Sequence, residues 1–464
     1  MVEQQEQNLS VGRNVKIGLF HLGSGMADVI MSGVWNRIMI TDLGFSATPV
    51  GLLISLRNFL APLGVWAGRM SDRRAVGGYR RLFWVWLGRL MMAVSMIVVG
   101  IVTANLVRGQ NATAATWVAF AVALGAFSLG SAISGSTFLA LIYDRTRPDQ
   151  RGRAVGIVWT FLLLGFSIGG FLFAVMLPSH KQGDPAGTLS FSPETLQNVF
   201  VVGAVIMGAL WFFSLLGEER RTPIAAAQPS EGEHATSLRA DLKLAWNNRQ
   251  TRFFFWYLAL SMMFAFAQDL VLEPFAGEVF EMSAATTTRF TAYWGSMAIL
   301  ASVAVLLLGR RYRRLTNTLL SYVGVGVLVA AFALFGLSAL GFIRPLVTIG
   351  LIVLGIGLGI WNIGTTGMMM EMSPFGRAGT FLGFWTMVVT IARGVGISGS
   401  GVVRDLLLAL TGNAALAYGL LFVLCMGGLV LSLWVLRQVN VQAFQSEQGV
   451  AKSDTATVLA GALD

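Results

Sequence analysis

The sequence predicts an all-α integral membrane protein. Of its 464 residues, 55% are hydrophobic and only 12% are charged, and the mean hydropathy is +0.68. Soluble domains carry about 25% charged residues, so this composition excludes an ordinary soluble protein. The 54 glycines and 13 tryptophans suit helices that pack closely within a bilayer and are anchored at its interfaces.

Twelve apolar segments are long enough to cross a membrane as helices, which takes roughly 20 residues. If successive segments alternate in direction, the loops form two sets, and the set with both chain ends holds most of the Lys and Arg. The opposite set holds four, namely Arg108, Lys181, Arg289 and Arg344. The positive-inside rule therefore places both termini in the cytoplasm. The predicted spans are about 16–40, 48–67, 82–104, 114–142, 153–178, 197–217, 252–274, 287–309, 316–340, 345–370, 379–404 and 414–436.

A polar linker divides the spans into two halves of six. Residues 218–251 are rich in Pro, Ser, Ala and charged side chains, and the stretch SLRADLKLAW within them predicts a short amphipathic helix. We therefore expect a first six-helix half at 1–217, a second at 252–440 and a polar, disordered tail at 441–464.

The two halves carry related motifs. RPDQRGRAVGIVWT (147–160) follows the fourth span and SPFGRAGTFLGFWT (373–386) follows the tenth, with Pro, Arg, Trp and Thr at matching positions. Duplicated six-span halves are the organisation of the major facilitator superfamily. We therefore predict that fold, with two pseudosymmetric halves around a central cavity.

The loop between the second and third spans, GRMSDRRAVGGYRR, resembles the loop signature of that superfamily, although its second half is loose. Gly68 would allow two helices to approach closely. Asp72 would accept a hydrogen bond from a helix N-terminus or pair with an arginine such as Arg73, which would stabilise one conformation. An equally good interpretation is that the arginines of this loop only determine the topology.

A second cytoplasmic loop, YDRTRPDQRGRAVG, lies between the fourth and fifth spans. Asp144 ends the fourth span, and Arg151 and Arg153 open the fifth. An ion-pair network between these helices and a solvated loop are equally good interpretations.

Ionisable residues inside the spans are costly in a bilayer and are usually paired or functional. Asp28 lies near the middle of span one and Arg57 near the middle of span two, at a similar depth in adjacent antiparallel helices. We expect the two side chains to form an ion pair, and a substrate or proton role is the alternative. Arg393 lies past the middle of span eleven, on a glycine-rich face.

Span seven ends in FAQDLVLEPFAGEVFEMS (266–283), where Asp269 and Glu273 share one helical face before Pro274. Counting depth along the helix places both carboxylates towards the periplasmic end of the span. Arg37 ends span one in the other half, and spans one and seven face each other in such folds. We therefore predict an ion pair from Arg37 to Asp269 or Glu273 that closes the periplasmic side.

The sequence contains no phosphate-binding loop, zinc-ligand spacing or catalytic triad. Its three histidines are scattered over a span, a loop and the linker, and the single cysteine, Cys425, lies in an apolar run. We therefore expect no metal site and no enzyme. The net charge of +10 lies in short loops, so membrane topology accounts for it and nucleic acid is not an expected partner.

Four stretches resemble the PucC/LhaA group, the bacteriochlorophyll-delivery branch of the major facilitator superfamily. They are GVWNRIMITDLGF (33–45), FLAPLGVWAGRMSD (59–72), DRTRPDQRGRAVGIVW (144–159) and above all QDLVLEPFAGEVFEMSAATTT (268–288). Ala276 and Glu281 depart from the pattern, because many members have glycine there. The family motifs fall here on Asn36, Arg37, Gln268, Asp269, Leu272, Glu273, Pro274, Gly277 and Phe280.

The resemblance implies a membrane factor that delivers or shields bacteriochlorophyll or chlorophyll while light-harvesting or reaction-centre complexes assemble. It implies antenna or reaction-centre subunits and pigment-synthesis enzymes as partners, and an intracytoplasmic photosynthetic membrane as the location. Carotenoid or lipid would be further bound molecules. His21 could then ligate the magnesium of a chlorin, although a lone membrane histidine is more often a packing residue. Asn362 could donate to a chlorin carbonyl or simply join helices.

Two further interpretations of the residues stay open. One is a proton-coupled exporter of a small amphipathic molecule that uses Asp28, Asp269 or Glu273 as the titrating group. The other is a scaffold that does not transport. The predicted periplasmic position of Asp269 and Glu273 favours a gate or a contact with a pigment's polar group over a central proton relay.

Overall fold

The computed structural model of the chain describes residues 11–73, 75–145, 151–177, 192–219, 246, 248–312, 315–373 and 378–448. Nearly all of these residues are helical, and this part of the chain contains no β-strand beyond an isolated bridge between Val76 and Tyr79. Within it, eleven helices are long and apolar enough to cross a membrane. The prediction of an all-α membrane protein is confirmed.

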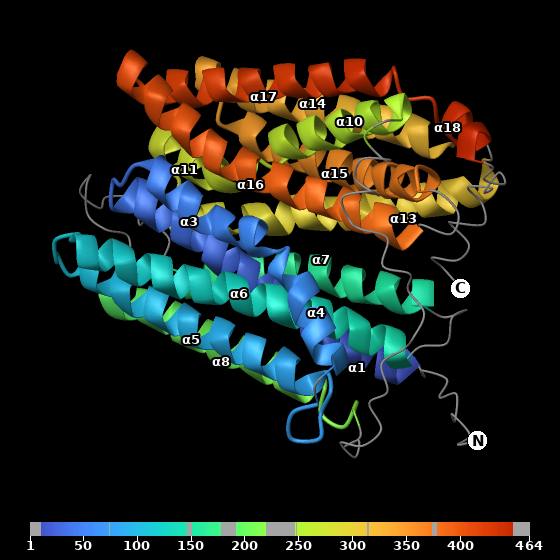
Figure 1. Cartoon of the computed structure of the whole chain (residues 1–464). Coiled ribbons are helices and arrows are strands. Elements are labelled where there is room, and N and C mark those ends of the chain that lie inside the picture. Colours follow the sequence, from blue (N-terminus) through green and yellow to red (C-terminus); the bar gives the residue numbers. More distant parts are fainter. Residues whose placement is uncertain are drawn as a thin grey trace.

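The helices form two halves that lie side by side in Figure 1. The first half contains α1 (Val11–Asp28), the π-helical η1 (Val29–Val34), α2 (Trp35–Arg37), the π-helical η2 (Ile38–Asp42), α3 (Ala47–Leu60), α4 (Leu63–Arg73), α5 (Leu82–Val107), α6 (Ala114–Arg145), α7 (Arg151–Met176) and α8 (Pro193–Phe213). The second half contains α10 (Arg249–Ala265), α11 (Gln268–Phe280), α12 (Ala284–Thr288), α13 (Phe290–Arg311), α14 (Asn317–Gly341), α15 (Pro345–Glu371), α16 (Ala378–Thr411), α17 (Ala414–Leu436) and α18 (Val441–Gln448). The halves meet where α3 packs on α16 and α7 packs on α13.

The contact between α3 and α16 depends on a glycine. A Cβ atom added at Gly401 would lie 2.7 Å from the carbonyl oxygen of Ala47, in the first turn of α3. Small residues allow such close backbone approach between membrane helices. We call the end of the bundle that carries Asp42, Ala47 and Met282 the outer end, and the end where α1 begins the inner end. The predicted topology makes the outer end periplasmic, and this orientation stays a prediction.

The first span is one continuous helix from Gly12 to Asp42 that contains two π-helical segments. A π-turn contains more residues than an α-turn, so it rotates the side chains that follow it, and such turns are frequent at functional sites. η1 begins directly after Asp28, and α2 lies between η1 and η2. The side chains of α2, which include Asn36 and Arg37, are therefore rotated about the helix axis relative to their positions in an unbroken α-helix.

The second predicted span, 48–67, is not one continuous helix. α3 ends at Leu60, residues Ala61 and Pro62 form a turn, and α4 begins at Leu63. Proline lacks the N–H that would continue the helical ladder, and its ring clashes with the preceding turn. The apolar run is long enough to cross a membrane, but proline divides it into two helices.

The seventh span is longer than the predicted 252–274, because the helical segment runs from Arg249 to Phe280. It breaks briefly between α10 and α11 and then continues through Pro274. Glu281 ends α11 with a φ of +52°, in the left-handed region that favours glycine. Glycine, which the resembling sequences have at this position, suits this conformation better than glutamate.

Both chain ends differ in part from expectation. Val441–Gln448, expected in a disordered tail, forms α18, which packs on α10 and α15 and buries Phe444. Residues 449–464 lie outside the described residues. So does the predicted amphipathic helix in the linker, apart from Trp246.

Candidate functional site

Two ion pairs lie in the centre of the bundle, one in each half. Arg57 on α3 pairs with Asp28 at the end of α1, which confirms that prediction. Arg393 on α16 binds Asp269 on α11, with Nη2 and Nε lying 2.6 and 3.1 Å from the same carboxylate oxygen. Gln268 donates to the other oxygen of Asp269 at 2.5 Å. Each carboxylate therefore has its own guanidinium partner, which offsets the cost of placing these charges inside a span.

These residues line two small cavities between the halves. Both cavities are lined by Ser32, Arg57, Asp269 and Arg393, and one of them also by Asp28, Gln268 and Glu273. Their volumes are about 30 and 40 Å³. A polar cavity of that size holds one or a few water molecules. The centre is therefore polar and, in this conformation, too small for an organic ligand.

Asp269 lies deeper than predicted. It stands in the first turn of α11 and lines the same cavity as Asp28 and Arg57. Its predicted position near the periplasmic end is therefore wrong, because the span continues through Pro274 to Phe280 and so has its middle further along the chain.

Pro274 continues the helix because Asn36 of the other half supplies a missing hydrogen bond. Proline has no N–H, so the carbonyl four residues earlier, that of Leu270, loses its helical donor. The side-chain amide of Asn36 donates to the Leu270 carbonyl at 2.9 Å and lies 3.2 Å from that of Asp269. The motif residues of spans one and seven thus complete each other across the interface.

The predicted ion pair between Arg37 and Asp269 or Glu273 is wrong. Arg37 pairs instead with Asp42 of its own half, at 3.0 Å, and donates to the carbonyl of Met282 in the other half, at 2.9 Å. Its guanidinium packs on Gly277, where an added Cβ would lie 2.5 Å from Nε. Arg37 still joins the two halves, but through a backbone carbonyl at the outer end.

Glu273 is the central carboxylate without an ion pair among the described residues. Only 5% of its surface is exposed, its Oε2 has no hydrogen-bond partner, and it lines the central cavity. This carboxylate lies against Gly33 of span one, where an added Cβ would be in ordinary van der Waals contact with Oε1, at 3.4 Å.

Two other candidates lie away from this centre. His21 packs among aromatic rings, with its centroid 5.0 Å from Phe138 and 6.1 Å from Trp159. Asn362 on α15 is exposed. Neither contributes to the central cavities, and a role for either in pigment binding stays a prediction. Within the described residues, no group of three or more His, Cys, Asp or Glu side chains could hold a metal ion.

The inner end carries the loop motifs. Asp144 pairs with Arg81 at 2.9 Å, and Arg81 also donates to Ser71 at 2.6 Å. An added Cβ at Gly68 would meet no atom within 4 Å, so the expected close helix approach does not occur there. The side chains of Asp72, Arg73, Arg151 and Arg153 lie outside the described residues.

Two acidic residues, Glu218 and Glu219, were expected in the linker but contact the first half. Glu219 accepts from the backbone N–H groups of Arg80, Arg81 and Leu82 at 2.7–3.1 Å, where a carboxylate stabilises the start of α5. Glu218 pairs with Arg13 and Lys16 of α1. Two adjacent acidic residues directly after a span were the sequence feature that could have indicated these contacts.

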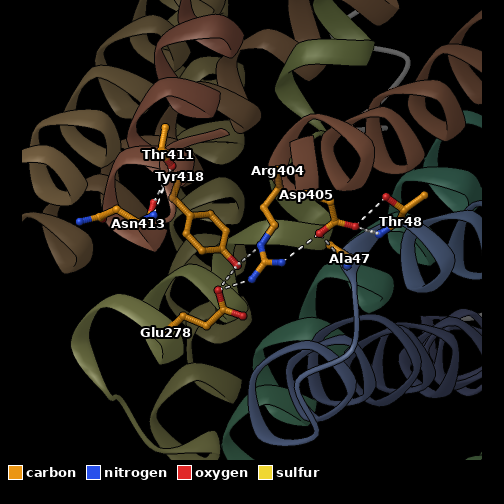
Figure 2. Close-up of polar contacts among 8 residues, drawn as sticks. All are labelled: Ala47, Thr48, Glu278, Arg404, Asp405, Thr411, Asn413 and Tyr418. Carbon is orange, nitrogen blue, oxygen red and sulfur yellow. Dashed lines mark hydrogen bonds and ion pairs between the residues drawn. The ribbon is translucent and has the colours of Figure 1, made fainter. Parts of the chain in front are cut away.

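A network at the outer end was also missed, and Figure 2 shows it. Asp405 on α16 accepts from the backbone N–H groups of Ala47 and Thr48 at 3.0 and 2.8 Å, and from the Thr48 hydroxyl at 2.7 Å. A carboxylate of one half thus caps a helix of the other half. Arg404 pairs with Asp405 at 2.9 Å and also with Glu278. We call these five residues, with Tyr418, the outer network.

Tyr418 completes the outer network by donating to Glu278 at 3.0 Å. The groups come from α3, α11, α16 and α17, so no single stretch of sequence contains the network. The Arg-Asp pair at the end of the eleventh span was its only local signal.

The sequence matches the family model described as PUCC protein over residues 34–444. Protein PucC of Rhodovulum sulfidophilum is 28% identical over 411 residues, which are 87% of this chain and 87% of that protein. A protein of Rhodobacter capsulatus named bacteriochlorophyll synthase 44.5 kDa chain is 29% identical over 462 residues, which are 96% of this chain and 98% of that protein.

Solved structures of transporters share the fold. The crystal structure of the nucleoside transporter NupG has a TM-score of 0.63 at 14% identity, over 92% of this chain and 99% of that one. A bacterial homolog of the human lysosomal transporter Spinster, in an inward-facing and unoccupied conformation, has a TM-score of 0.65 at 14% identity, over 97% of each chain. The chain is therefore a multi-pass membrane protein with the major facilitator fold, and it belongs to the PucC protein family.

Proposed function

We propose that this protein holds bacteriochlorophyll or chlorophyll in a photosynthetic membrane and passes it to light-harvesting or reaction-centre subunits as they assemble. The match to the PucC family over residues 34–444 carries this proposal. A relative over nearly the whole chain is named as a chain of bacteriochlorophyll synthase. We assign no catalytic step to this chain, so pigment-synthesis enzymes are proposed as partners that supply the pigment.

The position of the family motifs supports holding an apolar cargo. Four of the motif residues build the interface between the halves, namely Asn36, Arg37, Pro274 and Gly277. Three others, Gln268, Asp269 and Glu273, line only a small central cavity. The central cavities measure about 30 and 40 Å³, whereas small-molecule pockets measure about 300–1,000 Å³. A cargo that dissolves in the bilayer needs no water-filled path through the centre.

Purification of the tagged protein from its photosynthetic host, in a mild detergent, tests this function. We expect the absorbance of a chlorin pigment to elute with the protein, together with antenna or reaction-centre subunits. Protein that elutes without pigment and without these subunits would contradict the proposal. Extraction of the bound fraction identifies the pigment and any carotenoid or lipid that accompanies it.

A second function, proton-coupled transport of a small amphipathic molecule, is favoured by Glu273. Asp28 and Asp269 each have an arginine partner, so Glu273 is the central acid whose proton could be exchanged without breaking an ion pair. A pH jump applied to proteoliposomes on a solid-supported membrane should then produce a transient proton current. Glu273→Gln should abolish this current, and a wild-type protein without any current would exclude this function.

A further inference from the structure

An apolar groove lies on the first half, between α5 and α8. Its volume is about 410 Å³, more than ten times that of either central cavity and within the range of small-molecule pockets. The groove is lined by Phe83, Trp86, Leu87, Arg89, Leu90, Ala93, Gly208, Trp211 and Phe212.

The walls of the groove are rich in aromatic rings. Trp86 of α5 and Phe212 of α8 contact each other across the two helices, with centroids 5.2 Å apart. The groove opens to the side of the bundle, since Leu90 is 62% exposed and Phe212 is 44% exposed. At Gly208 an added Cβ would meet no atom within 4 Å, so this glycine leaves the groove open. Molecules dissolved in the bilayer can therefore reach it.

A buried arginine without an ion pair lies in the wall. Arg89 is only 5% exposed, and its guanidinium lies over the rings of Phe20 and Trp211, at 4.2 and 4.8 Å. Its Nη1 donates only to the sulfur of Met92, at 3.3 Å, and its Nε has no partner. Among the described residues it forms no ion pair, although buried guanidinium groups are normally paired.

Among the side chains that line the groove, Trp86 and Arg89 carry hydrogen-bond donors, and none carries a strong acceptor. The indole N–H of Trp86 is buried without a partner, as is the Nε of Arg89. Phe, Leu, Ala, Gly, Trp and Arg side chains carry no acceptor oxygen. The fitting occupant is therefore an apolar molecule that brings its own acceptor oxygen.

The depth of Arg89 indicates where on the occupant that oxygen lies. Arg89 is seven residues after Leu82, which begins α5, so it lies roughly 10 Å along the helix. The phosphate of a phospholipid lies at the membrane surface, whereas the carbonyl groups of a chlorin are attached to its flat apolar ring. Aromatic walls also suit a flat conjugated ring, because such rings stack face to face or edge to face.

We propose that this groove is the pigment site, in which a chlorin enters from the bilayer, its ring lies against the aromatic walls and one of its carbonyl oxygens accepts from Arg89. This inference rests on the proposed function and adds to it a binding site on the side of the first half, between α5 and α8. The two halves need not separate for the pigment to bind.

The test fills the groove and measures the pigment that remains bound. Gly208→Leu places a side chain in open space and removes a helical glycine, so it should fold. The matched control is Gly125→Leu on α6, where an added Cβ also meets nothing and which does not line the groove. We expect Gly208→Leu to lower the pigment-to-protein absorbance ratio about tenfold, equal to about 1.4 kcal/mol, and Gly125→Leu to leave it unchanged.

Arg89→Met tests the hydrogen bond separately. We expect retained pigment to show a higher carbonyl stretching frequency in resonance Raman spectra, because the carbonyl loses its donor. Pigment that stays bound to Gly208→Leu at the wild-type ratio would overturn this site and leave the proposed function intact. If native mass spectrometry shows that Gly208→Leu loses a bound phospholipid but retains the pigment, the groove binds lipid and the proposed pigment site is overturned too. Wild-type protein without pigment would contradict both proposals.

Discussion

The two ends of the bundle differ in how their polar contacts are distributed. At the outer end, hydrogen bonds cross between the halves: Arg37 donates to the carbonyl of Met282 in the second half, and Asp405 caps α3 of the first. At the inner end, Glu219 caps α5 and Asp144 pairs with Arg81, and both of these contacts lie within the first half. Polar contacts at the outer end therefore join the two halves, while these inner contacts stabilise the first half alone.

The largest effect is expected from removing Arg404. This side chain is 6% exposed and pairs with both Glu278 and Asp405 in the outer network. Breaking a buried pair leaves uncompensated charge and typically costs about 3–5 kcal/mol. Arg404→Ala should therefore lower the Tm in detergent strongly. Arg108→Ala, which removes an exposed pair with Glu194, is the control, and equal Tm values for the two variants would refute the prediction.

The next largest effect is expected at Asn36. Asn36→Leu leaves the Leu270 carbonyl without a donor, which should lower the free energy of unfolding by about 1–3 kcal/mol. In a Pro274→Ala background, the restored backbone N–H can donate to that carbonyl. The cost of Asn36→Leu should therefore be smaller there, in a double-mutant cycle measured by thermal unfolding. Additive effects would show that Asn36 and Pro274 are not coupled.

A smaller effect should separate the two ends functionally. Asp405→Asn keeps an oxygen that accepts from α3 and from Arg404, and Arg404 keeps Glu278 as its charged partner. The lost charge weakens the cap on α3 by about 1 kcal/mol, so the outer end should open about fivefold more often. An open cavity of about 680 Å³ lies at the outer end, beside Arg404 and Asp405, and the buried Ile40 lines it. In an Ile40→Cys variant, the rate at which this cysteine is alkylated should rise about fivefold. Cys425 is buried, which keeps the background low.

Glu219→Gln is the matched control for this experiment, because it weakens a carboxylate cap at the inner end. It should leave the alkylation rate of Ile40→Cys unchanged. A rise of equal size in both variants would mean that the two ends do not act separately.

The smallest effect is a gain in stability at Glu281. Its φ of +52° is unfavourable for a residue with a Cβ atom and natural for glycine. Glu281→Gly should raise the free energy of unfolding by about 0.5–1 kcal/mol, seen as a higher Tm. Glu281→Ala keeps the Cβ and should give no such gain, so equal stabilisation by both would attribute the effect to the lost charge instead.

Composition and local pattern were sufficient for the membrane class, the main spans and the pairing of Asp28 with Arg57. Apolar runs are local features, and these two charges stand at similar depth in consecutive helices, so sequence spacing determines that they can meet. The length of an apolar run does not predict whether its helix is continuous, because Pro62 divides the second span into two helices.

Only the tertiary structure decided the partners that lie far apart in the sequence. Arg393 finds Asp269 because span eleven packs beside span seven, and nothing in either stretch encodes that neighbour. Arg37 does face span seven, but it packs there on Gly277, beyond Glu273, and its partners are Asp42 and the carbonyl of Met282. Pro274 predicts a helix break, yet α11 continues through it. The carbonyl of Leu270, which proline leaves without a backbone donor, accepts from Asn36 of the other half. A sequence specifies which groups need partners, whereas packing decides which partners are within reach.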